Sequence, residues 1–144
     1  MLQRLSSRFP AYDQFGPRVP VSCVTPAVGR VFHRFFDTSP FSPSGRYLAL
    51  TRLPFEDRLP QPGDPAEVVI VDLQTGEERT VAETRGWDTQ LGAQCQWGAS
   101  DHDLFFNDQD TTVWKPYGVR LNPATGTVRH LDGPVYMVSP DGKQ

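Results

Sequence analysis

Cysteine is scarce in this sequence of 144 residues, which contains only Cys23 and Cys95. Two cysteines are too few for the disulfide framework that stabilises many small secreted domains. Free cysteines are among the most frequently buried residues in proteins. We therefore expect both residues to be buried free thiols.

Long apolar runs are also absent. No stretch approaches the roughly 18 apolar residues that a membrane-spanning helix requires, so we expect no membrane span. Residues 1–20 contain charged side chains but neither the apolar segment nor the small-residue cleavage site of a secretory signal. The expected compartment is therefore the cytoplasm, or the periplasm if the N-terminus is incomplete.

The sequence carries no concentration of positive charge. Its formal net charge is −3, and its lysines and arginines are scattered along the chain. Nucleic-acid binding proteins usually show a basic patch or stripe. Nucleic acid is therefore not an expected partner.

No segment shows the periodicity of a helix, because proline or glycine interrupts every window of helical length. The chain contains 14 prolines and 12 glycines, a composition typical of many short strands and turns. Eight segments have the alternating or β-branched pattern of strands. They are residues 21–25, 47–51, 67–73, 78–83, 93–97, 103–107, 118–121 and 127–131.

A four-residue turn motif occurs twice. Ser-Pro-Ser-Gly at residues 42–45 returns as Ser-Pro-Asp-Gly at residues 139–142, and each copy follows an apolar residue, Phe41 or Val138. Self-similarity at this distance is the signature of repeat architectures such as propellers and solenoids. We therefore expect a repeated strand–turn–strand unit.

The strands around this turn repeat as well. When Phe41 is aligned with Trp97, Leu48 falls on Leu104 without a gap, so residues 98–101 form a degenerate copy of the turn. The spacing of 56 residues between the two copies, with four strands in between, suits one blade of a β-propeller.

A second, hairpin-like turn follows the same repeat. Residues 72–76 (Asp-Leu-Gln-Thr-Gly) match residues 122–126 (Asn-Pro-Ala-Thr-Gly). The fold expected from these repeats is all-β: a propeller fragment of about two four-stranded antiparallel blades and the start of a third.

These boundaries divide the chain into four parts. Residues 1–31 form an N-terminal segment, and residues 32–84 form the first blade with a proline-rich insertion at 54–66. The second blade covers residues 87–132, and residues 134–144 begin a third.

Each blade has two apolar faces and needs neighbours to bury them. We therefore expect the chain to be the front part of a longer propeller, with later blades of the same protein as partners. In that complete ring, the strand at residues 21–25 is expected to pair with the last blade.

The repeat motifs resemble those of TolB-type, WD-like β-propeller proteins. The resemblance is carried by Phe-Ser-Pro-Ser-Gly-Arg-Tyr-Leu-Ala at residues 41–49, Val-Asp-Leu-Gln-Thr-Gly-Glu at 71–77 and Val-Ser-Pro-Asp-Gly-Lys at 138–143. Residues 33–144 are also similar in blade layout to the oligogalacturonate lyase group, which acts on unsaturated pectin fragments. That likeness implies that metal-binding and catalytic residues belong to later blades, so no cofactor and no catalytic residue are expected in this chain.

Three residues at the start of the first inner strand are candidates for ligand binding. His33 and Arg34 lie close to Asp37, and inner strands line the central channel of a propeller. A cation beside a carboxylate is suited to hold an acidic sugar or another acid. The alternative is an ordinary salt bridge at the end of a strand.

The equivalent part of the second blade gives four more candidates. Trp87, Asp88 and Gln90 precede the second inner strand, and Gln94 begins a polar face on it. A polar face is suited to a water-filled channel that binds a ligand. The alternative is that the glutamines only bond to neighbouring strands.

Two acidic clusters, residues 101–103 and 107–110, have the residue types of metal ligands. Their positions in a turn and at the end of a strand favour turn chemistry instead. His33, His102 and His130 form no zinc motif. No metal site is therefore predicted.

Aromatic residues allow two interpretations. Trp114 is suited to stack on a sugar ring, but Trp114 and Trp97 also suit packing between blades. Phe105 and Phe106 lie on one strand and are expected in the core.

The function most consistent with these patterns is a scaffold that binds a ligand or a protein and has no complete active site in this chain. One alternative is the N-terminal part of an oligogalacturonate lyase-like enzyme, with an acidic oligosaccharide as its substrate. A second alternative is a TolB-like component of an envelope assembly.

Overall fold

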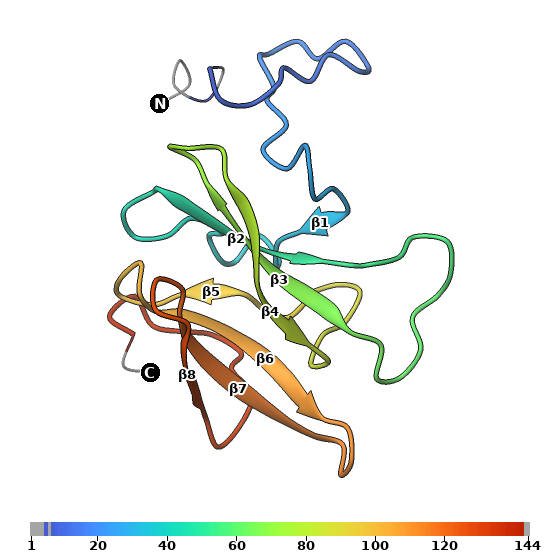
Figure 1. Cartoon of the computed structure of the whole chain (residues 1–144), viewed down its shortest axis with the longest axis vertical. Coiled ribbons are helices and arrows are strands. Elements are labelled where there is room, and N and C mark those ends of the chain that lie inside the picture. The colour runs from blue at the N-terminus through green and yellow to red at the C-terminus, as the bar shows by residue number, and fades with distance from the viewer. Residues whose placement is uncertain (1–4, 6, 143–144) are drawn as a thin grey trace.

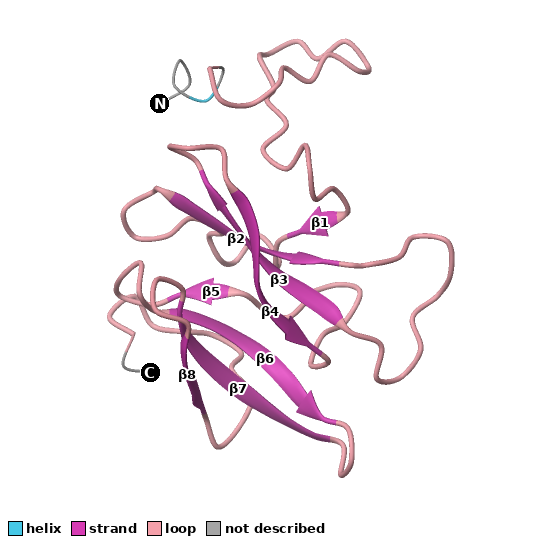
Figure 2. Cartoon of the chain, viewed as in Figure 1, coloured by secondary structure: helices cyan, strands magenta, loops and turns pink. Residues whose placement is uncertain are grey.

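The computed structural model of the chain describes residue 5 and residues 7–142. Predictions for residues 1–4, 6, 143 and 144 lie outside this range. The named elements of the described residues are strands, and they form two four-stranded sheets (Figures 1 and 2). They are β1 (Val31–Phe32), β2 (Tyr47–Arg52), β3 (Ala66–Asp72), β4 (Glu78–Thr84), β5 (Gln96–Trp97), β6 (Leu104–Asp110), β7 (Lys115–Asn122) and β8 (Thr127–His130). The prediction of an all-β fold is confirmed.

Both sheets are antiparallel meanders. Sheet one has the order β1-β2-β3-β4, and sheet two has the order β5-β6-β7-β8. The registers correspond, because Leu48 pairs with Val71 in sheet one and Leu104 pairs with Leu121 in sheet two. The two sheets are therefore versions of one structural unit.

The repeated turn motif has one geometry in both copies. The amide of Gly45 donates to the carbonyl of Ser42 at 2.8 Å, and the amide of Gly142 donates to the carbonyl of Ser139 at 2.8 Å. The two glycines have φ angles of 71° and 68°. Glycine adopts this left-handed conformation without steric cost, which explains why both copies end in glycine.

The second repeated turn is also preserved. The amide of Gly76 donates to the carbonyl of Asp72 at 2.8 Å, and Gly126 donates to Asn122 at the same distance. The Oδ1 atoms of Asp72 and Asn122 accept the amides of the residues two and three positions later. Asparagine and aspartate often hold turns in this way, so the substitution between the copies keeps the structure.

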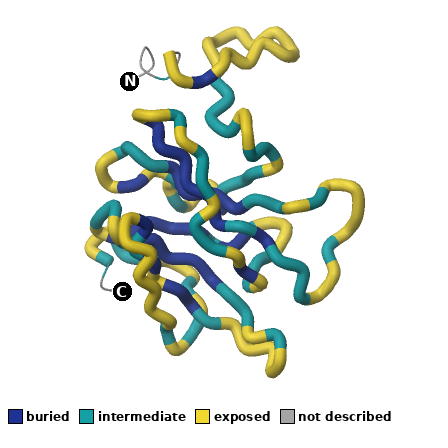
Figure 3. The backbone as a smooth tube through the Cα atoms, in the orientation of Figure 1, coloured by how far each residue is buried: buried dark blue, intermediate teal, exposed yellow. Residues whose placement is uncertain are grey.

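The main core lies between the two sheets, whose strands contain most of the buried segments in Figure 3. Trp97 lies at its edge, where its ring stacks on Tyr47 with centroids 6.2 Å apart. The indole Nε1 also donates to the carbonyl of Pro40 at 3.0 Å. The interpretation of Trp97 as a packing residue between units is confirmed. The buried residues of this core are Ala49, Val68, Ile70, Ala93, Cys95, Trp97, Leu104, Phe106, Val119 and Leu121.

A second core covers the other face of sheet one. Phe9 from the N-terminal segment is buried there against Leu48, Leu50, Val71 and Leu73. The N-terminal segment therefore shields the face of sheet one that points away from sheet two.

One side chain joins each unit to the segment that follows it. In the first unit, Thr51 Oγ1 accepts the amide of Ala93 at 3.0 Å. At the equivalent place in the second unit, Asn107 Oδ1 accepts the amide of Val135 at 2.7 Å, and Asn107 Nδ2 donates to the Val135 carbonyl at 2.8 Å. Equivalent side chains of the two units therefore bond to the backbone of the segment that follows each unit.

Two expected strands, and the expected start of a third blade, differ from the structure. Residues 21–25 form no strand, and Ser22 makes only an isolated bridge with Ala11. The prolines that flank this segment cannot donate to a ladder. The pairing of this segment with a later blade stays a prediction.

The expected strand at residues 93–97 is reduced to β5, because Gln94 has a φ of 56° that interrupts the extended backbone. Residues 134–138 are not a strand either. They are held by side-chain amides instead, since Gln96 Nε2 donates to the Tyr136 carbonyl and Gln96 Oε1 accepts the Val138 amide, both at 3.0 Å.

The two cysteines are both free but differ in burial. Cys95 is buried in the main core, and burial raises the pKa of its thiol to about 12. Cys23 is only half-buried, so the expectation of two buried thiols is wrong for this residue.

Candidate functional site

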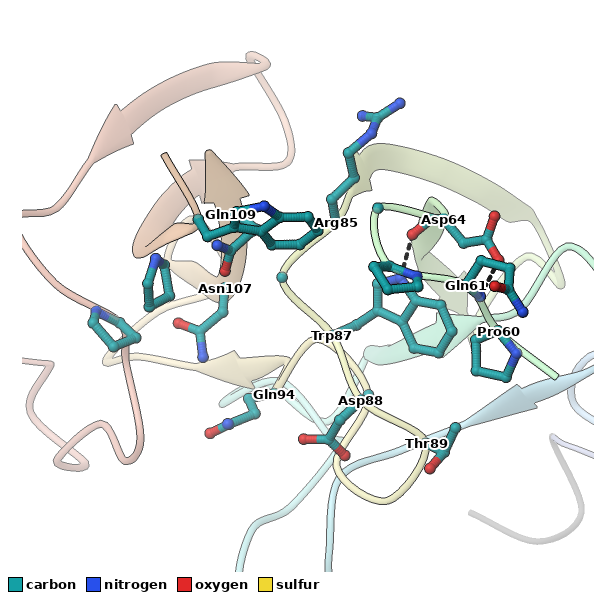
Figure 4. A pocket seen from close by; sticks show the side chains of 17 residues that line it. Pro60, Gln61, Asp64, Arg85, Trp87, Asp88, Thr89, Gln94, Asn107 and Gln109 are labelled. Carbon is teal, nitrogen blue, oxygen red and sulfur yellow. Dashed lines mark hydrogen bonds between the residues drawn. The ribbon is translucent and has the colours of Figure 1, made fainter. Parts of the chain in front are cut away.

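A cleft of about 600 Å³ lies where three segments meet (Figure 4). These are the proline-rich loop between β2 and β3, the connection between the two sheets, and the hairpin between β6 and β7. The cleft is lined by residues 60–64, 85–89, Gly92, Gln94, Asn107, Gln109, Trp114, Pro116 and Pro134.

The proline-rich loop is held against the second unit. Trp87 Nε1 donates to the carbonyl of Asp64 at 2.8 Å, as the dashed line in Figure 4 shows. The Asp64 carboxylate accepts Arg58 Nη1 and the amide of Gln61, each at 2.6 Å. The bond from Arg58 is the main reason why the pKa of Asp64 is below its usual value. The insertion is therefore an anchored wall of the cleft.

Asp108 anchors the connection between the sheets. Its Oδ1 accepts the amides of Arg85 and Gln109, both at 2.8 Å, and its Oδ2 accepts the hydroxyl of Tyr117 at 2.8 Å. Thr84 Oγ1 also donates to Oδ1, at 3.2 Å. Burial acts to raise the pKa of Asp108, but these bonds outweigh it and the pKa is lowered.

Asp88 and Gln94 shape the floor of the cleft. Asp88 Oδ1 accepts the amides of Gln90 and Leu91 at 2.7 and 2.6 Å, which closes a tight turn. Gln94 follows this turn in the left-handed conformation. Its buried Oε1 has no hydrogen-bond partner within the described part of the chain.

The cleft contains three of the residues predicted from the second unit. Trp87, Asp88 and Gln94 line it, as Figure 4 shows. Gln90 lies next to them in sequence, but it is exposed and does not line the cleft. Their predicted role in ligand binding stays a prediction.

The predicted group from the first unit does not reach the cleft. Arg34 is only 3% exposed and forms a salt bridge with Asp37 at 3.3 Å. Its guanidinium also donates to the Tyr136 carbonyl and lies 4.6 Å from the centre of the Tyr136 ring. Burial lowers the pKa of the neighbouring His33. The alternative of a salt-bridged strand end therefore describes Arg34 and Asp37 better than a ligand grip.

The structure adds cleft residues that the sequence did not identify. The wall at residues 60–64 was predicted only as a loop, and Asn107 and Gln109 were assigned to turn chemistry. Trp114, which the sequence did suggest for stacking on a sugar ring, lies at the rim and is 57% exposed, so it is not packed between the two units of this chain. It lies at the turn of a hairpin that extends beyond the core.

The acidic clusters make contacts between segments, so the prediction of turn chemistry describes them only in part, and residues 107–110 belong to β6 instead of starting a loop. Asp101 accepts the amide of Ser44 at 3.1 Å and its hydroxyl at 2.5 Å, and Asp103 pairs with Arg120. Among residues 5 and 7–142, no group of three or more histidine, cysteine, aspartate or glutamate residues is arranged to hold a metal ion. The same residues include no helix long and apolar enough to cross a membrane.

Comparison with known proteins returns no match. No protein-family model, curated protein or solved structure was matched by this chain. The geometry described above is therefore the basis for any assignment.

Proposed function

We propose that this chain is part of a TolB-type, β-propeller-like scaffold that binds a ligand in the cleft between its units and further units on the open face of sheet two. The observation that carries the proposal is the equivalent side-chain contact that joins each unit to the segment after it. Thr51 makes this contact with Ala93, and Asn107 makes it with Val135. A scaffold of this kind holds its partners and transforms none of them.

Sheet one shows how a unit face is covered. The face that contains Ala49 and Ile70 is buried against Leu104 and Leu121 of sheet two. Arg79 extends this contact, because its Nη2 donates to the carbonyl of Pro123 at 3.0 Å across the junction.

The equivalent face of sheet two is only partly covered. By the alignment of the units, Phe105 and Arg120 correspond to Ala49 and Ile70, and the structure pairs them in the same register. Both line a groove of about 370 Å³, together with Arg129 and the segment at residues 133–138. We propose that a further unit fills this groove and offers a carbonyl to Arg129, as Pro123 does to Arg79.

The cleft supports binding more directly than catalysis. Its two carboxylates, Asp64 and Asp88, are engaged in the loop and turn contacts described above, and the cleft-lining residues include no histidine. The lyase-like and envelope-assembly alternatives gain no specific support from the described residues.

The groove can be tested by the association of the isolated chain. An unfilled unit face exposes apolar surface and favours self-association. We expect the protein to form dimers or larger species at about 100 µM in sedimentation velocity. Met137→Glu, which places a charge in the groove, should return it to a monomer.

Phe36→Ser is the matched control, because Phe36 is an exposed aromatic residue outside the groove. This variant should associate like the original protein. A monomeric original protein, or equal association of the groove variant and the control, would contradict the proposed scaffold.

A further inference from the structure

We infer that the cleft binds an uncharged, polyhydroxylated ligand, which is a short neutral saccharide. This inference rests on the proposed ligand-binding role of the cleft and not on the assignment to a propeller. Four features of the cleft support it: its charges, its free amides, its exposed indole and its rigid walls.

The charges at the cleft already have partners. Arg85 pairs with Glu83 at 2.8 Å, and Asp64 pairs with Arg58 at 2.6 Å. Asp88 is held by two backbone amides of its own turn. An ionic ligand would have to displace these contacts, and an acidic ligand would also face two carboxylates and only one guanidinium among the lining side chains.

The polar groups that remain for a ligand are neutral amides. Gln61, Gln94 and Gln109 all line the cleft. Each terminal amide carries donors and an acceptor, which matches the mixed character of sugar hydroxyls. Gln94 has a particular reason to bind, because its buried Oε1 lacks a partner and a rotation of the amide toward a ligand hydroxyl would provide one.

Trp114 supplies an apolar surface at the rim. Its indole is more than half exposed, although large aromatic side chains normally gain stability by burial. Its φ is 52°, a conformation that is unfavourable for a bulky residue. Four non-glycine residues in the described part of the chain have a positive φ, and two of them, Gln94 and Trp114, line this cleft. Such conformations concentrate at ligand sites.

The walls of the cleft are rigid and have a suitable size. Prolines 60, 62, 116 and 134 line it and have no amide hydrogen to satisfy. Its volume of about 600 Å³ lies within the usual range for small-ligand sites. The indole and the proline rings suit the apolar faces of a pyranose ring. The neutral amides suit the hydroxyl groups at the edge of that ring.

The ligand class can be tested by isothermal titration calorimetry with the 144-residue protein. The probes are cellotriose, xylotriose and mannotriose, with trigalacturonate as the acidic counterpart of similar size. We expect at least one neutral trisaccharide to bind with a Kd below about 1 mM and trigalacturonate to bind at least tenfold more weakly.

Variants at Trp114 locate the binding. Trp114→Asn removes the ring and keeps a residue that tolerates a positive φ, and it should weaken binding about tenfold or more. Trp114→Phe retains a ring and should keep most of the affinity. Phe36→Ser, an aromatic deletion outside the cleft, should leave the affinity unchanged.

Three results would overturn the inference. The first is that no neutral trisaccharide shows binding at a ligand concentration of about 10 mM, tenfold above the stated Kd limit. The second is an affinity that does not respond to Trp114→Asn. The third is tight binding of trigalacturonate alone, which would reject the neutral ligand but leave the ligand-binding scaffold standing.

Discussion

At the scale of single residues, Asp108 shows how one carboxylate can hold two units together. It lies on β6 of the second unit and accepts hydrogen bonds from Thr84 and Arg85, which end the first unit and begin the connection. The bond from Tyr117 fixes the same carboxylate to β7. Hydrogen bonds to a charged group are stronger than neutral ones, so this residue is a main determinant of the cleft geometry.

We predict that Asp108→Asn lowers the free energy of unfolding by about 1–3 kcal/mol at pH 7. The pKa of Asp108 is lower in the folded protein than the usual 3.9 or so of an aspartate. Its stabilising effect is therefore complete above that usual value and is lost as the pH falls through the folded pKa. Urea unfolding at several pH values should show the difference between the two proteins narrowing below about pH 4.

Asp132→Asn is the control for this measurement, because Asp132 is exposed at the surface. It should change stability by less than about 0.5 kcal/mol at any pH. A difference between Asp108→Asn and the original protein that stays constant down to pH 2 would show that the charge of Asp108 is not responsible.

At the scale of elements, the connection from β4 to the second unit depends on a close approach of two backbones. A Cβ atom on Gly86 would lie 2.5 Å from the Cα atom of Asp108. Real Cβ atoms do not approach a backbone so closely, and a backbone inside a sheet cannot move without loss of its ladder. Only glycine fits at this crossing.

We predict that Gly86→Ala destabilises the protein by about 1–3 kcal/mol, because the added methyl group forces the connection away from β6. Gly133→Ala is the matched control, since a Cβ atom there meets nothing within 4 Å. Thermal unfolding of both variants measures the difference. Equal melting temperatures would show that the connection is free to shift.

At the scale of the whole molecule, stability comes from burying the faces of the two sheets against each other. Neither sheet can shield both of its faces alone, and the core between them contains residues from both units. Trp97 is the largest of these residues and bonds to Pro40 of the first unit. The two units are therefore expected to unfold together.

We predict that Trp97→Ala costs about 3–5 kcal/mol and separates the unfolding of the units. A domain of this size has a total stability of only about 5–15 kcal/mol, so the loss is large. Differential scanning calorimetry should give equal calorimetric and van't Hoff enthalpies for the original protein and unequal values for the variant.

Trp114→Ala removes an exposed indole of the same type and serves as the control. It should retain a single transition. If Trp97→Ala still unfolds in one transition with equal calorimetric and van't Hoff enthalpies, other contacts couple the two units. That result would disprove the importance of Trp97 at this junction.

The repeats could be predicted from the sequence because they depend on local rules. The turns that contain Gly45, Gly76, Gly126 and Gly142 are specified by residues within four positions of each other. The β-branched run of β3 likewise indicates a strand that is buried on both faces. The same reasoning failed at residues 21–25, where the strand pattern had no regular neighbour to pair with.

The candidate site was only partly predictable, because it depends on contacts between segments that are distant in the sequence. Trp87, Asp88 and Gln94 could be identified, since the polar residues around the second inner strand are adjacent in sequence. The wall at residues 60–64 and the indole of Trp114 reach the cleft from two other elements. The sequence left two interpretations of Arg34 open, and its contact with Tyr136 could not be foreseen because that residue lies about a hundred positions away.

The sequence by itself determined the all-β class, the two four-stranded units and their turns, because neighbouring residues decide backbone conformation and alternation. Only the tertiary structure decided which tryptophan is buried, which charges are already paired and where a cleft opens. Those properties depend on segments that meet after the chain folds, and burial and pairing are relations between such segments.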